Sequence, residues 1–182
     1  MDLHVYSGQE ARDVMGTPEN DERLSELCET LEKTTERGGD IRENVAHGRE
    51  RVHQMLANDQ MYVGTTGEEV VSVLGYELVG VYEGRPHFEI RNAVTHPNHQ
   101  RQGHYRQLVQ RCYADIKAQY PNAFVVTITN NDNVVQRCES DALKEIPIRE
   151  WSHMHWDGWP NIDEKEEGGY RVFLYDIENF KE

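Results

Sequence analysis

The apolar positions up to residue 60 recur with helical spacing, whereas those of residues 61–95 alternate or cluster as they do in β-strands. A short strand is predicted at Leu3–Tyr6. Thr17-Pro18 suits the start of a helix, because proline fits the first helical position, and Gly38-Gly39 suits its end. Asp40 with Glu43 resembles the capping arrangement of a second helix. Apolar stripes support both helices: Leu24, Leu27, Cys28 and Leu31 in the first, and Ile41, Val45, Val52, Met55 and Leu56 in the second.

Three strands are predicted between residues 61 and 95, because β-branched and aromatic residues dominate this region. A turn at Thr66-Gly67 separates residues 61–66 from 68–82, and a turn at 83–86 precedes residues 87–95. Strict alternation divides the last segment into two faces. One face carries His87, Glu89, Arg91, Ala93 and Thr95, and the other carries Phe88, Ile90, Asn92 and Val94.

The spacing becomes helical again after Gly103, and Pro121 marks the end of this helix. Residues 123–129 then have the unbroken apolar run of a buried strand. The polar residues 130–132 are of types that cap helix starts, so a short helix with Val134, Val135 and Cys138 is predicted next. The stripe of the longer helix consists of Tyr105, Leu108, Val109, Cys112 and Ile116.

Residues 149–156 and 170–177 are predicted as two closing strands on either side of an acidic, glycine-rich loop. The whole order is two helices, an antiparallel meander, a strand–helix–strand–helix segment and two strands. It predicts an α+β fold in which helices flank a mixed, mostly antiparallel central sheet. The length of 182 residues suits one domain, over residues 1–182, with a core of its own.

Composition and charge narrow the classes of partner. Hydrophobic residues make up 37% and charged residues 29% of the chain, which fits a soluble globular protein. A net charge of −14 repels phosphate backbones and anionic lipids, so we expect neither nucleic acid nor a membrane as partner. The start, MDLHVYSGQE, lacks the basic and apolar regions of a signal peptide, and a cytoplasmic location is expected.

The three cysteines, Cys28, Cys112 and Cys138, lie far apart in the sequence and form no C-x-x-C pair. Neither a disulfide scaffold nor a zinc knuckle is therefore indicated.

A short polar turn, Gln100-Arg101-Gln102-Gly103, lies between a predicted strand and a predicted helix. The N–H groups at a helix start lack partners within the helix, and the dipole adds about half a positive charge there, so a diphosphate is a natural ligand. Gly103 lets such a ligand approach the backbone closely. The P-loop and G-x-G-x-x-G patterns are both absent. The alternative is that Gly103 only starts a helix.

At these residues the sequence resembles the acyl-coenzyme-A signature of the GNAT N-acetyltransferase superfamily, which is roughly V-x-P-x-x-[QR]-x-x-G-x-[GA]-x-x-L. Thr95 stands at the valine position, and the matching positions are Pro97, Gln100, Gly103 and Leu108. Tyr105 departs from the pattern, because a small residue is usual there. Its side chain is expected to point into the core, so that the backbone alone meets the pyrophosphate.

A second segment, NNDNVVQRCE, resembles the N-x-x-A-x-x-x-Y pattern of the same family. Asn131 falls on the asparagine and Val134 on the small apolar position, whereas Cys138 replaces the tyrosine. The order of predicted elements is also similar to that of the family.

The resemblance implies acetyl-coenzyme A as acyl donor, and it implies which residues hold it. The backbone at Val94 and Thr95 would hold the thioester, and Asn131 would contact the pantetheine arm. The pyrophosphate would lie on Gln100, Arg101, Gln102, Gly103, His104 and Tyr105.

Glu89 is the candidate base that accepts the proton of an attacking amine, because a glutamate at this offset has that role in some GNAT enzymes. Six residues separate it from Thr95, so both should share a strand face. His87 is the alternative base, since its ordinary pKa is near 6.5, but at the start of a strand it is expected to be exposed. Cys138 is the candidate proton donor to the leaving thiolate, or else a small buried apolar residue.

The function that these inferences imply is acetyl transfer to a primary amine by direct attack in a ternary complex. The amine acceptor is unidentified, and its site would be lined by the early helices and the aromatic tail with Trp151, Trp156, Trp159 and Asp157. A homodimer is left open.

Two alternatives remain. Tyr105 and Cys138 favour a non-catalytic acyl-coenzyme-A-binding module for sensing or assembly. The histidines favour a metal-binding protein, but no paired carboxylate or thiolate spacing accompanies them, so no metal site is predicted. These histidines are His96, His99 and His104 around the turn, and His153 and His155 on one face of a predicted strand.

Overall fold

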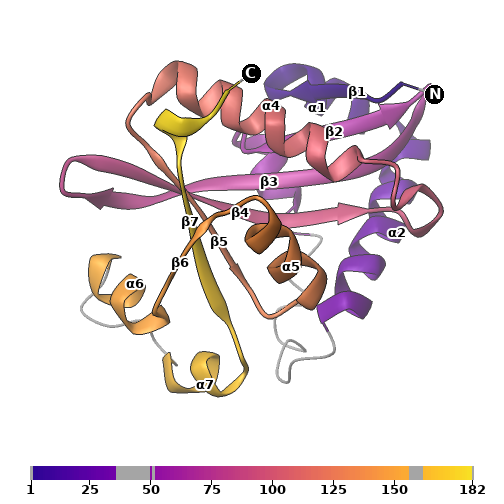
Figure 1. The fold of residues 1–182 in the computed structure, drawn as a ribbon. Coiled ribbons are helices and arrows are strands. Elements are labelled where there is room, and N and C mark those ends of the chain that lie inside the picture. Colours follow the sequence, from indigo (N-terminus) through magenta and orange to yellow (C-terminus); the bar gives the residue numbers. More distant parts are fainter. Residues whose placement is uncertain (1, 36–49, 51, 156–161, 182) are drawn as a thin grey trace. The chain divides into compact units, whose positions relative to one another are not determined.

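The computed structural model describes residues 2–35, 50, 52–155 and 162–181, which fall into two compact units (Figure 1). The first unit comprises Met1–Tyr76 and Arg91–Cys112, and the second comprises Glu77–Ile90 and Tyr113–Glu182. Each unit is described by itself below. The interpretation of residues 1–182 as one domain stays a prediction.

Seven strands form a mixed, mostly antiparallel sheet in the order β1-β2-β3-β4-β5-β7-β6. The pairs β1–β2, β2–β3, β5–β7 and β6–β7 are antiparallel, and β4–β5 is parallel. The predicted α+β class is therefore confirmed. The strands are β1 (His4–Ser7), β2 (Met61–Thr66), β3 (Glu69–Tyr82), β4 (Arg85–Thr95), β5 (Phe124–Thr129), β6 (Lys144–Ile146) and β7 (Arg171–Asp176).

Helices precede, separate and follow these strands. The predicted starts at Pro18 and after Gly103 are confirmed, and so is the short helix after Asn131. The predicted helix end at Gly38-Gly39 and cap at Asp40 lie outside the described residues, although residues 52–57 are helical. The elements are α1 (Gly8–Met15), α2 (Pro18–Thr35), η1 (Pro97–His99), α4 (His104–Gln119), α5 (Asp132–Ser140), α6 (Ile148–His155), α7 (Ile162–Glu167) and η2 (Ile177–Asn179).

The first closing strand predicted at residues 149–156 is wrong, because residues 148–155 form helix α6. Ile148, Trp151 and Ser152 are buried, at spacings of three and four that match a helix. The prediction that His153 and His155 share one face of a strand is therefore wrong as well, because this segment is not a strand. The acidic loop that follows contains α7, which was not predicted.

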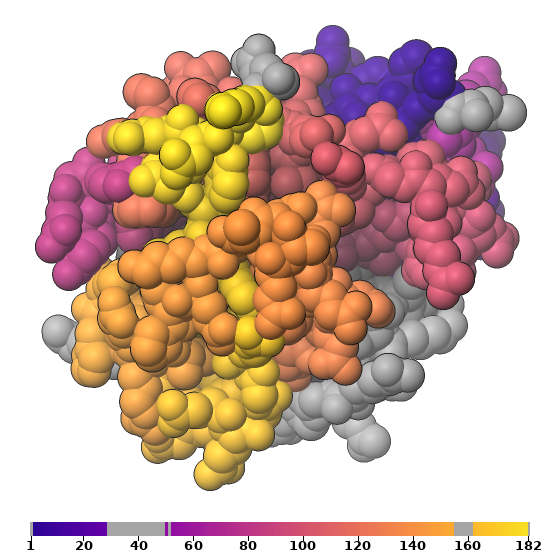
Figure 2. Space-filling view, viewed as in Figure 1, coloured from indigo at the N-terminus to yellow at the C-terminus, as the bar shows by residue number. Residues whose placement is uncertain are grey.

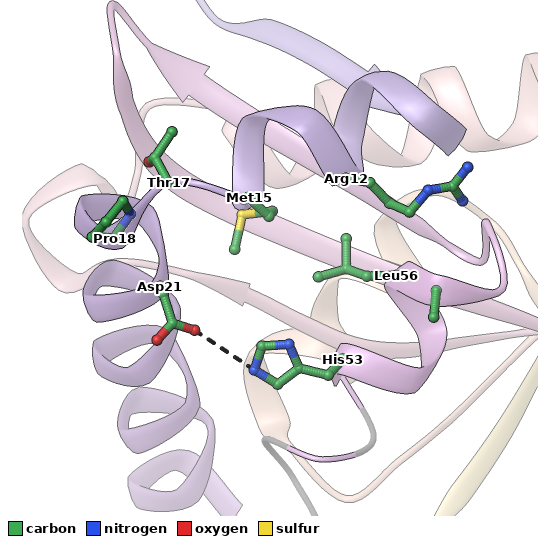
Figure 3. Close-up of a pocket in the computed structure, with 9 residues that line it drawn as sticks. Arg12, Met15, Thr17, Pro18, Asp21, His53 and Leu56 are labelled. Atoms are coloured by element: carbon green, nitrogen blue, oxygen red, sulfur yellow. Dashed lines mark ion pairs between the residues drawn. The ribbon is translucent and has the colours of Figure 1, made fainter.

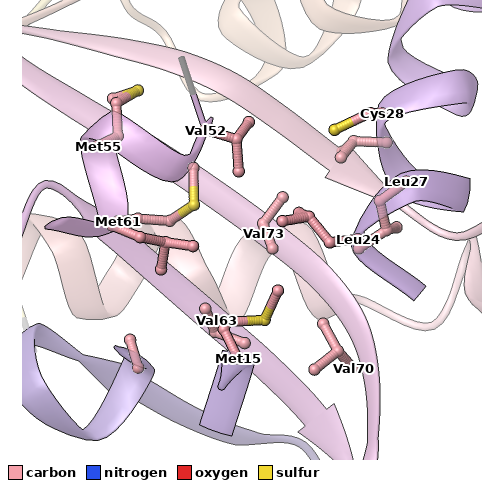
Figure 4. Close-up of a cluster of buried hydrophobic side chains, with 13 residues drawn as sticks. Met15, Leu24, Leu27, Cys28, Val52, Met55, Met61, Val63, Val70 and Val73 are labelled. Carbon is pink, nitrogen blue, oxygen red and sulfur yellow. The ribbon is translucent and has the colours of Figure 1, made fainter. Parts of the chain in front are cut away.

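The core of the first unit lies between its helices and the strands β2 and β3 (Figure 4). Leu24 and Leu27 of α2, which the predicted stripe contains, are buried here against Val63 and Val73. Burying such side chains stabilises the fold by about 1.5–3 kcal/mol each. Further members are Ala11, Met15, Cys28, Val52, Met55, Leu56, Met61, Val70 and Val94.

The second unit has a separate core around Trp151, whose side chain is fully buried. It joins α6 to the strands β5, β6 and β7 through Val126, Ile146, Ile148, Val172 and Leu174. In Figure 2 the orange-to-yellow atoms of this unit lie together on the face shown. Among the described residues of both units, no helix is long and apolar enough to cross a bilayer.

Candidate functional site

The turn at residues 100–103, which the sequence predicts to bind the cofactor and which is called the cofactor turn below, connects η1 to α4. It contains two left-handed residues, Arg101 at φ +62° and Gly103 at φ +82°. A Cβ atom added at Gly103 would meet no heavy atom within 4 Å. Glycine is therefore suited to this position by its backbone conformation and not by crowding, because L side chains disfavour positive φ.

The glutamine side chains of the turn fold back onto the preceding backbone. Gln100 Nε2 donates to the carbonyl oxygen of Thr95 at 3.2 Å, and Gln102 Nε2 donates to that of Asn98 at 3.3 Å. Both carbonyls belong to the segment that leads into the turn. These two bonds fix the turn to the end of β4 and to η1.

Helix α4 starts directly after the turn, and Gln107 N donates to Gly103 O at 3.2 Å. The amides of the first helical turn, including those of Gly103, His104 and Arg106, are not used inside the helix. Arg101 and Arg106 are exposed beside them. Together the amides, the helix dipole and the two guanidinium groups favour an anion locally, even though the whole chain carries a net charge of −14.

His104, and not Tyr105, takes the buried position at the start of α4. The His104 side chain is 4% exposed, whereas Tyr105 is only half-buried, so the expected core position of Tyr105 is filled by its neighbour. His104 lies four residues before Leu108, which is fully buried. Both ring nitrogens of His104 are buried and have no hydrogen-bond partner in the part of the chain described. Burial lowers the pKa of His104, so the ring is neutral near pH 7.

Ser72 of β3 holds the end of β4, and the sequence did not reveal it as a site residue. Its Oγ donates to Val94 O at 2.9 Å and shares a hydrogen bond of 2.8 Å with Thr95 Oγ1. Ser72 is fully buried within an apolar run. A lone polar residue in such a run must find a partner, and this is the signal that could have identified it.

Asn92 interrupts the strict alternation that was predicted for β4. Its φ is +49°, and its Nδ2 donates to Met55 Sδ at 3.2 Å. Phe88, Ile90 and Val94 are buried, as expected for one face. The alternation used to assign Glu89 and Thr95 to one face does not continue unbroken through Asn92.

Glu89 belongs to the second unit, where it is half-buried and pairs in register with Val126 of β5. His87, two residues earlier, is 1% exposed, which corrects the expectation of an exposed strand start. Its ring stacks on Trp151 at 5.7 Å and meets the edge of Phe124 at 5.1 Å. Enclosure between aromatic rings argues against His87 as the base.

Asn131 and Cys138 lie at the two ends of α5, also in the second unit. Asn131 Oδ1 accepts from Asn133 N at 3.0 Å, which confirms the predicted helix cap, and its Nδ2 can donate to a ligand carbonyl. Cys138 is 5% exposed. Burial, followed by the nearby Asp141 carboxylate, raises the pKa of Cys138 to about 11, so its thiol is protonated at neutral pH.

The histidines do not form a metal centre in the described residues. The rings of His96 and His99 lie 5.8 Å apart and those of His99 and His104 lie 6.2 Å apart. Across the described ranges, no group of three or more His, Cys, Asp or Glu side chains could hold a metal ion.

A shallow groove of about 470 Å³ runs between the start of α2 and residues 53–57 in the first unit (Figure 3). Met15 and Leu56 are apolar parts of its lining, and Asp21 and His53 form an ion pair across it at 3.7 Å. The groove involves the early helices that were expected at the acceptor site. Trp151 is instead part of the second core, and residues 156–161, with the other two tryptophans and Asp157, lie outside the described residues.

The chain has the fold of the GNAT acetyltransferases, which confirms the resemblance at the level of the fold. No protein-family model and no curated protein matches its sequence. A GNAT acetyltransferase from Staphylococcus aureus superposes with a TM-score of 0.65 at 10% identity, over 97% of this chain and 99% of that one.

An acetyltransferase from Streptococcus agalactiae gives a TM-score of 0.63 at 14% identity, over 96% and 98% of the two chains. N-acetylglutamate synthase from Neisseria gonorrhoeae, in complex with coenzyme A and N-acetyl-glutamate, gives 0.62 at 9% identity. That match covers 97% of this chain and 35% of the synthase.

Proposed function

We propose that the protein is an acetyl-coenzyme-A-dependent N-acetyltransferase that acts on a primary amine. The observation that carries this proposal is the cofactor turn, where two left-handed residues and two glutamine side chains fix a set of amides at the start of a long helix. Backbone amides in such an arrangement bind phosphate oxygens. The shared fold supports acetyl-coenzyme A as the particular diphosphate.

In this proposal, residues 100–105 bind the pyrophosphate of acetyl-coenzyme A. The backbone at Val94 and Thr95 binds the thioester and stabilises the oxyanion that forms when the carbonyl is attacked. Ser72 supports this role, because it ties Val94 O and Thr95 Oγ1 to β3. Asn131 donates to the pantetheine arm through Nδ2.

The chemistry requires a base for the amine and an acid for the leaving thiolate. Glu89 accepts a proton from the alkylammonium form, and the neutral amine then attacks the thioester carbonyl. The tetrahedral intermediate collapses, the C–S bond breaks and the thiolate of coenzyme A leaves, while the nitrogen releases its remaining extra proton to solvent. Cys138 is the proposed proton donor, although with a pKa of about 11 it is a weaker acid than an ordinary thiol. Loss of the Cys138 thiol should therefore lower the rate less than loss of the Glu89 carboxylate.

The acceptor amine is proposed to lie against the early helices. The groove beside α2 offers an apolar lining at Met15 and Leu56 and a carboxylate at Asp21. A cationic group of the acceptor other than the reacting amine is attracted to that carboxylate, and an attached hydrocarbon chain covers the apolar side chains. Asp21→Asn should then raise the KM of a cationic amine more than it changes kcat.

The test combines cofactor binding with turnover. Calorimetry should detect acetyl-coenzyme A binding to the wild type, and a panel of amines should release coenzyme A in the presence of enzyme. Glu89→Gln should reduce kcat by about 100-fold or more while leaving the Kd for acetyl-coenzyme A unchanged. Glu83→Gln, in the exposed β3–β4 turn, is the matched control and should keep full activity. Absence of binding at millimolar concentrations of acetyl-coenzyme A would refute the proposal.

A non-catalytic acyl-coenzyme-A-binding module is the second candidate, favoured by the weak acidity of Cys138. It predicts tight binding without turnover of any amine in the panel. Equal rates of acetyl-coenzyme A loss with wild type and Glu89→Gln would then support the module over the enzyme.

A further inference from the structure

A polar cluster in the first unit connects α2 to the segment that leads into the cofactor turn. Arg23 of α2 forms ion pairs with Glu26 and with Glu69 at the start of β3. Its Nη1 also lies 3.1 Å from His96 Nε2. His99 adds a second imidazole, with Nε2 at 3.6 Å from Glu69 Oε1. These five residues are called the histidine joint below.

His96 lies between two groups that can only donate hydrogen bonds. On one side is the Arg23 guanidinium, and on the other is the Asn98 backbone amide, at 3.3 Å from His96 Nδ1. A neutral imidazole has one accepting nitrogen and can bond to one of the two donors, whereas a protonated imidazole has none. Either contact therefore requires the neutral ring. The contact with Asn98 caps η1, the turn that precedes the cofactor turn.

The charges around His96 are mixed, and all of them belong to the joint. Burial is the largest influence on its pKa and lowers it, and Arg23 and His99 lower it further. Glu26, whose Oε2 lies 3.7 Å from His96 Nε2, and Glu69 act in the opposite direction. The pKa of His96 lies below its usual value of 6.5, so the ring is neutral at pH 7.5 and gains its proton only at a pH below 6.5.

We propose that neutral His96 is a positioning residue that holds the segment before the cofactor turn by accepting a hydrogen bond from Asn98 N beside Arg23 of α2, and that protonation of His96 releases this segment and weakens coenzyme A binding. The predicted weakening of coenzyme A binding rests on the proposed function. An imidazolium at this position would have no accepting nitrogen and would face a guanidinium and an amide, so it would lose the hydrogen bond from Asn98 N. The η1 cap would be lost with that bond, and the loop from Pro97 to Gly103 would open.

Calorimetric titration with coenzyme A between pH 7.5 and 5.5 tests the functional consequence. The wild type should bind about tenfold more weakly at pH 5.5, which corresponds to one or two hydrogen bonds. His96→Asn keeps an acceptor for the Asn98 amide, so it should bind about threefold more weakly at pH 7.5. It should then lack the further loss in acid that His96 titration causes. His4→Asn, at an exposed position of β1, should behave like the wild type.

Arg23→Met provides a signed readout that a purely structural role would not produce. Removing the guanidinium leaves Glu26 and Glu69 beside His96, so the pKa of His96 should rise and the loss of affinity should begin at higher pH. The double variant Arg23→Met/His96→Asn should lose this shift. Arg23→Lys keeps the charge and should restore much of the wild-type midpoint.

Amide hydrogen exchange of residues 98–106 without ligand, corrected for the intrinsic pH dependence, tests the joint independently. Faster exchange in acid for the wild type but not for His96→Asn supports the joint. Equal acid responses of the two proteins, in exchange or in affinity, overturn it. The phosphate monoester of coenzyme A also titrates near pH 6, but it is the same ligand for both proteins. If the wild type binds no coenzyme A at any pH, the proposed function fails, and exchange alone decides the joint.

Discussion

Left-handed backbone at residues that carry a side chain marks several of the turns. Among the described residues these positions are Asp59, Glu83, Asn92, Arg101 and Ala142. Each costs conformational energy that glycine would avoid, about 1–2 kcal/mol for an L residue in this region. Arg101 and Gly103 bring two left-handed conformations into one short turn of the candidate site, as Glu83 and Gly84 do in the β3–β4 turn.

Gly103→Ala should lower both stability and affinity for coenzyme A. The alanine must hold φ near +82°, which should lower the free energy of unfolding by about 1–2 kcal/mol. Gly67→Ala is a matched control, because Gly67 is also left-handed and its added Cβ would also meet nothing within 4 Å. Urea unfolding should show similar losses for both variants, whereas calorimetry should show lost affinity for Gly103→Ala alone. Equal affinities of the two variants for coenzyme A would contradict binding of the cofactor at this turn.

Ala142→Gly should raise the stability. Ala142 follows α5 at φ +55°, in a helix end where Ala142 N donates to Glu139 O and Leu143 N donates to Cys138 O. This hydrogen-bond pattern favours glycine at the left-handed position, and the gain should be about 0.5–1 kcal/mol. Ala118→Gly, at an exposed position of α4, should instead lose about 1 kcal/mol. Thermal unfolding of the two variants measures the contrast, and a loss in both would contradict it.

At the scale of elements, the structure shows which patterns identify secondary structure and which do not. β2 and β3 could be predicted from their β-branched and aromatic residues, β4 from its alternating residues before Asn92, and α4 from the helical spacing of its apolar residues. The α6 segment fits a period of two as well as a helix, and only the packing of Trp151 in the second core decides between them. Helix α1 was missed because its buried apolar residues are few, Ala11 and Met15.

The residues of the candidate site also differ in whether the sequence could predict them. Gly103 and its turn could be predicted, because the chemistry of a left-handed turn before a helix is local in sequence. Ser72 and the contact of Arg23 with His96 could not, because each joins residues that only the fold brings together. The burial of His104 could not be predicted either, because a polar residue is not expected in the apolar stripe of a helix.

Ser72→Ala should weaken the connection between β3 and the end of β4. The substitution removes the hydroxyl that serves Val94 O and Thr95 Oγ1, and leaving such groups unsatisfied should cost about 1–3 kcal/mol. Ser25→Ala is the control, because that hydroxyl bonds to Asp21 O within helix α2 and alanine favours a helix. Urea unfolding should therefore show a loss for Ser72→Ala and little change for Ser25→Ala. An unchanged free energy of unfolding in Ser72→Ala would contradict a stabilising role for these hydrogen bonds.

At the scale of the whole molecule, proton uptake links the histidines to stability. Burial lowers the pKa of His104, and burial with Arg23 lowers that of His96. The unfolded chain, with histidine pKa values near 6.5, therefore takes up protons that the folded chain excludes. Stability from these groups is complete above that value and is lost as the pH falls below it.

His104→Leu should reduce this acid sensitivity. Leucine carries no titrating group, so the fall in the free energy of unfolding between pH 7.5 and 5.5 should be smaller than in the wild type. Urea unfolding at the two pH values gives the comparison. His4→Gln, at an exposed position of β1, should leave the pH dependence close to that of the wild type. An unchanged slope in His104→Leu would mean that His104 is not the source.

All three cysteines are buried, with exposures of 6% for Cys28, 0% for Cys112 and 5% for Cys138. Thiol-directed dyes need an accessible thiolate, and a buried thiol offers little of it. The folded protein should thus be nearly silent toward Ellman-type reagents. In an assay of the proposed acetylation, colour from the reagent will therefore report the thiol of released coenzyme A and not the thiols of the protein. A sudden rise of colour in the absence of substrates will indicate that the protein has unfolded.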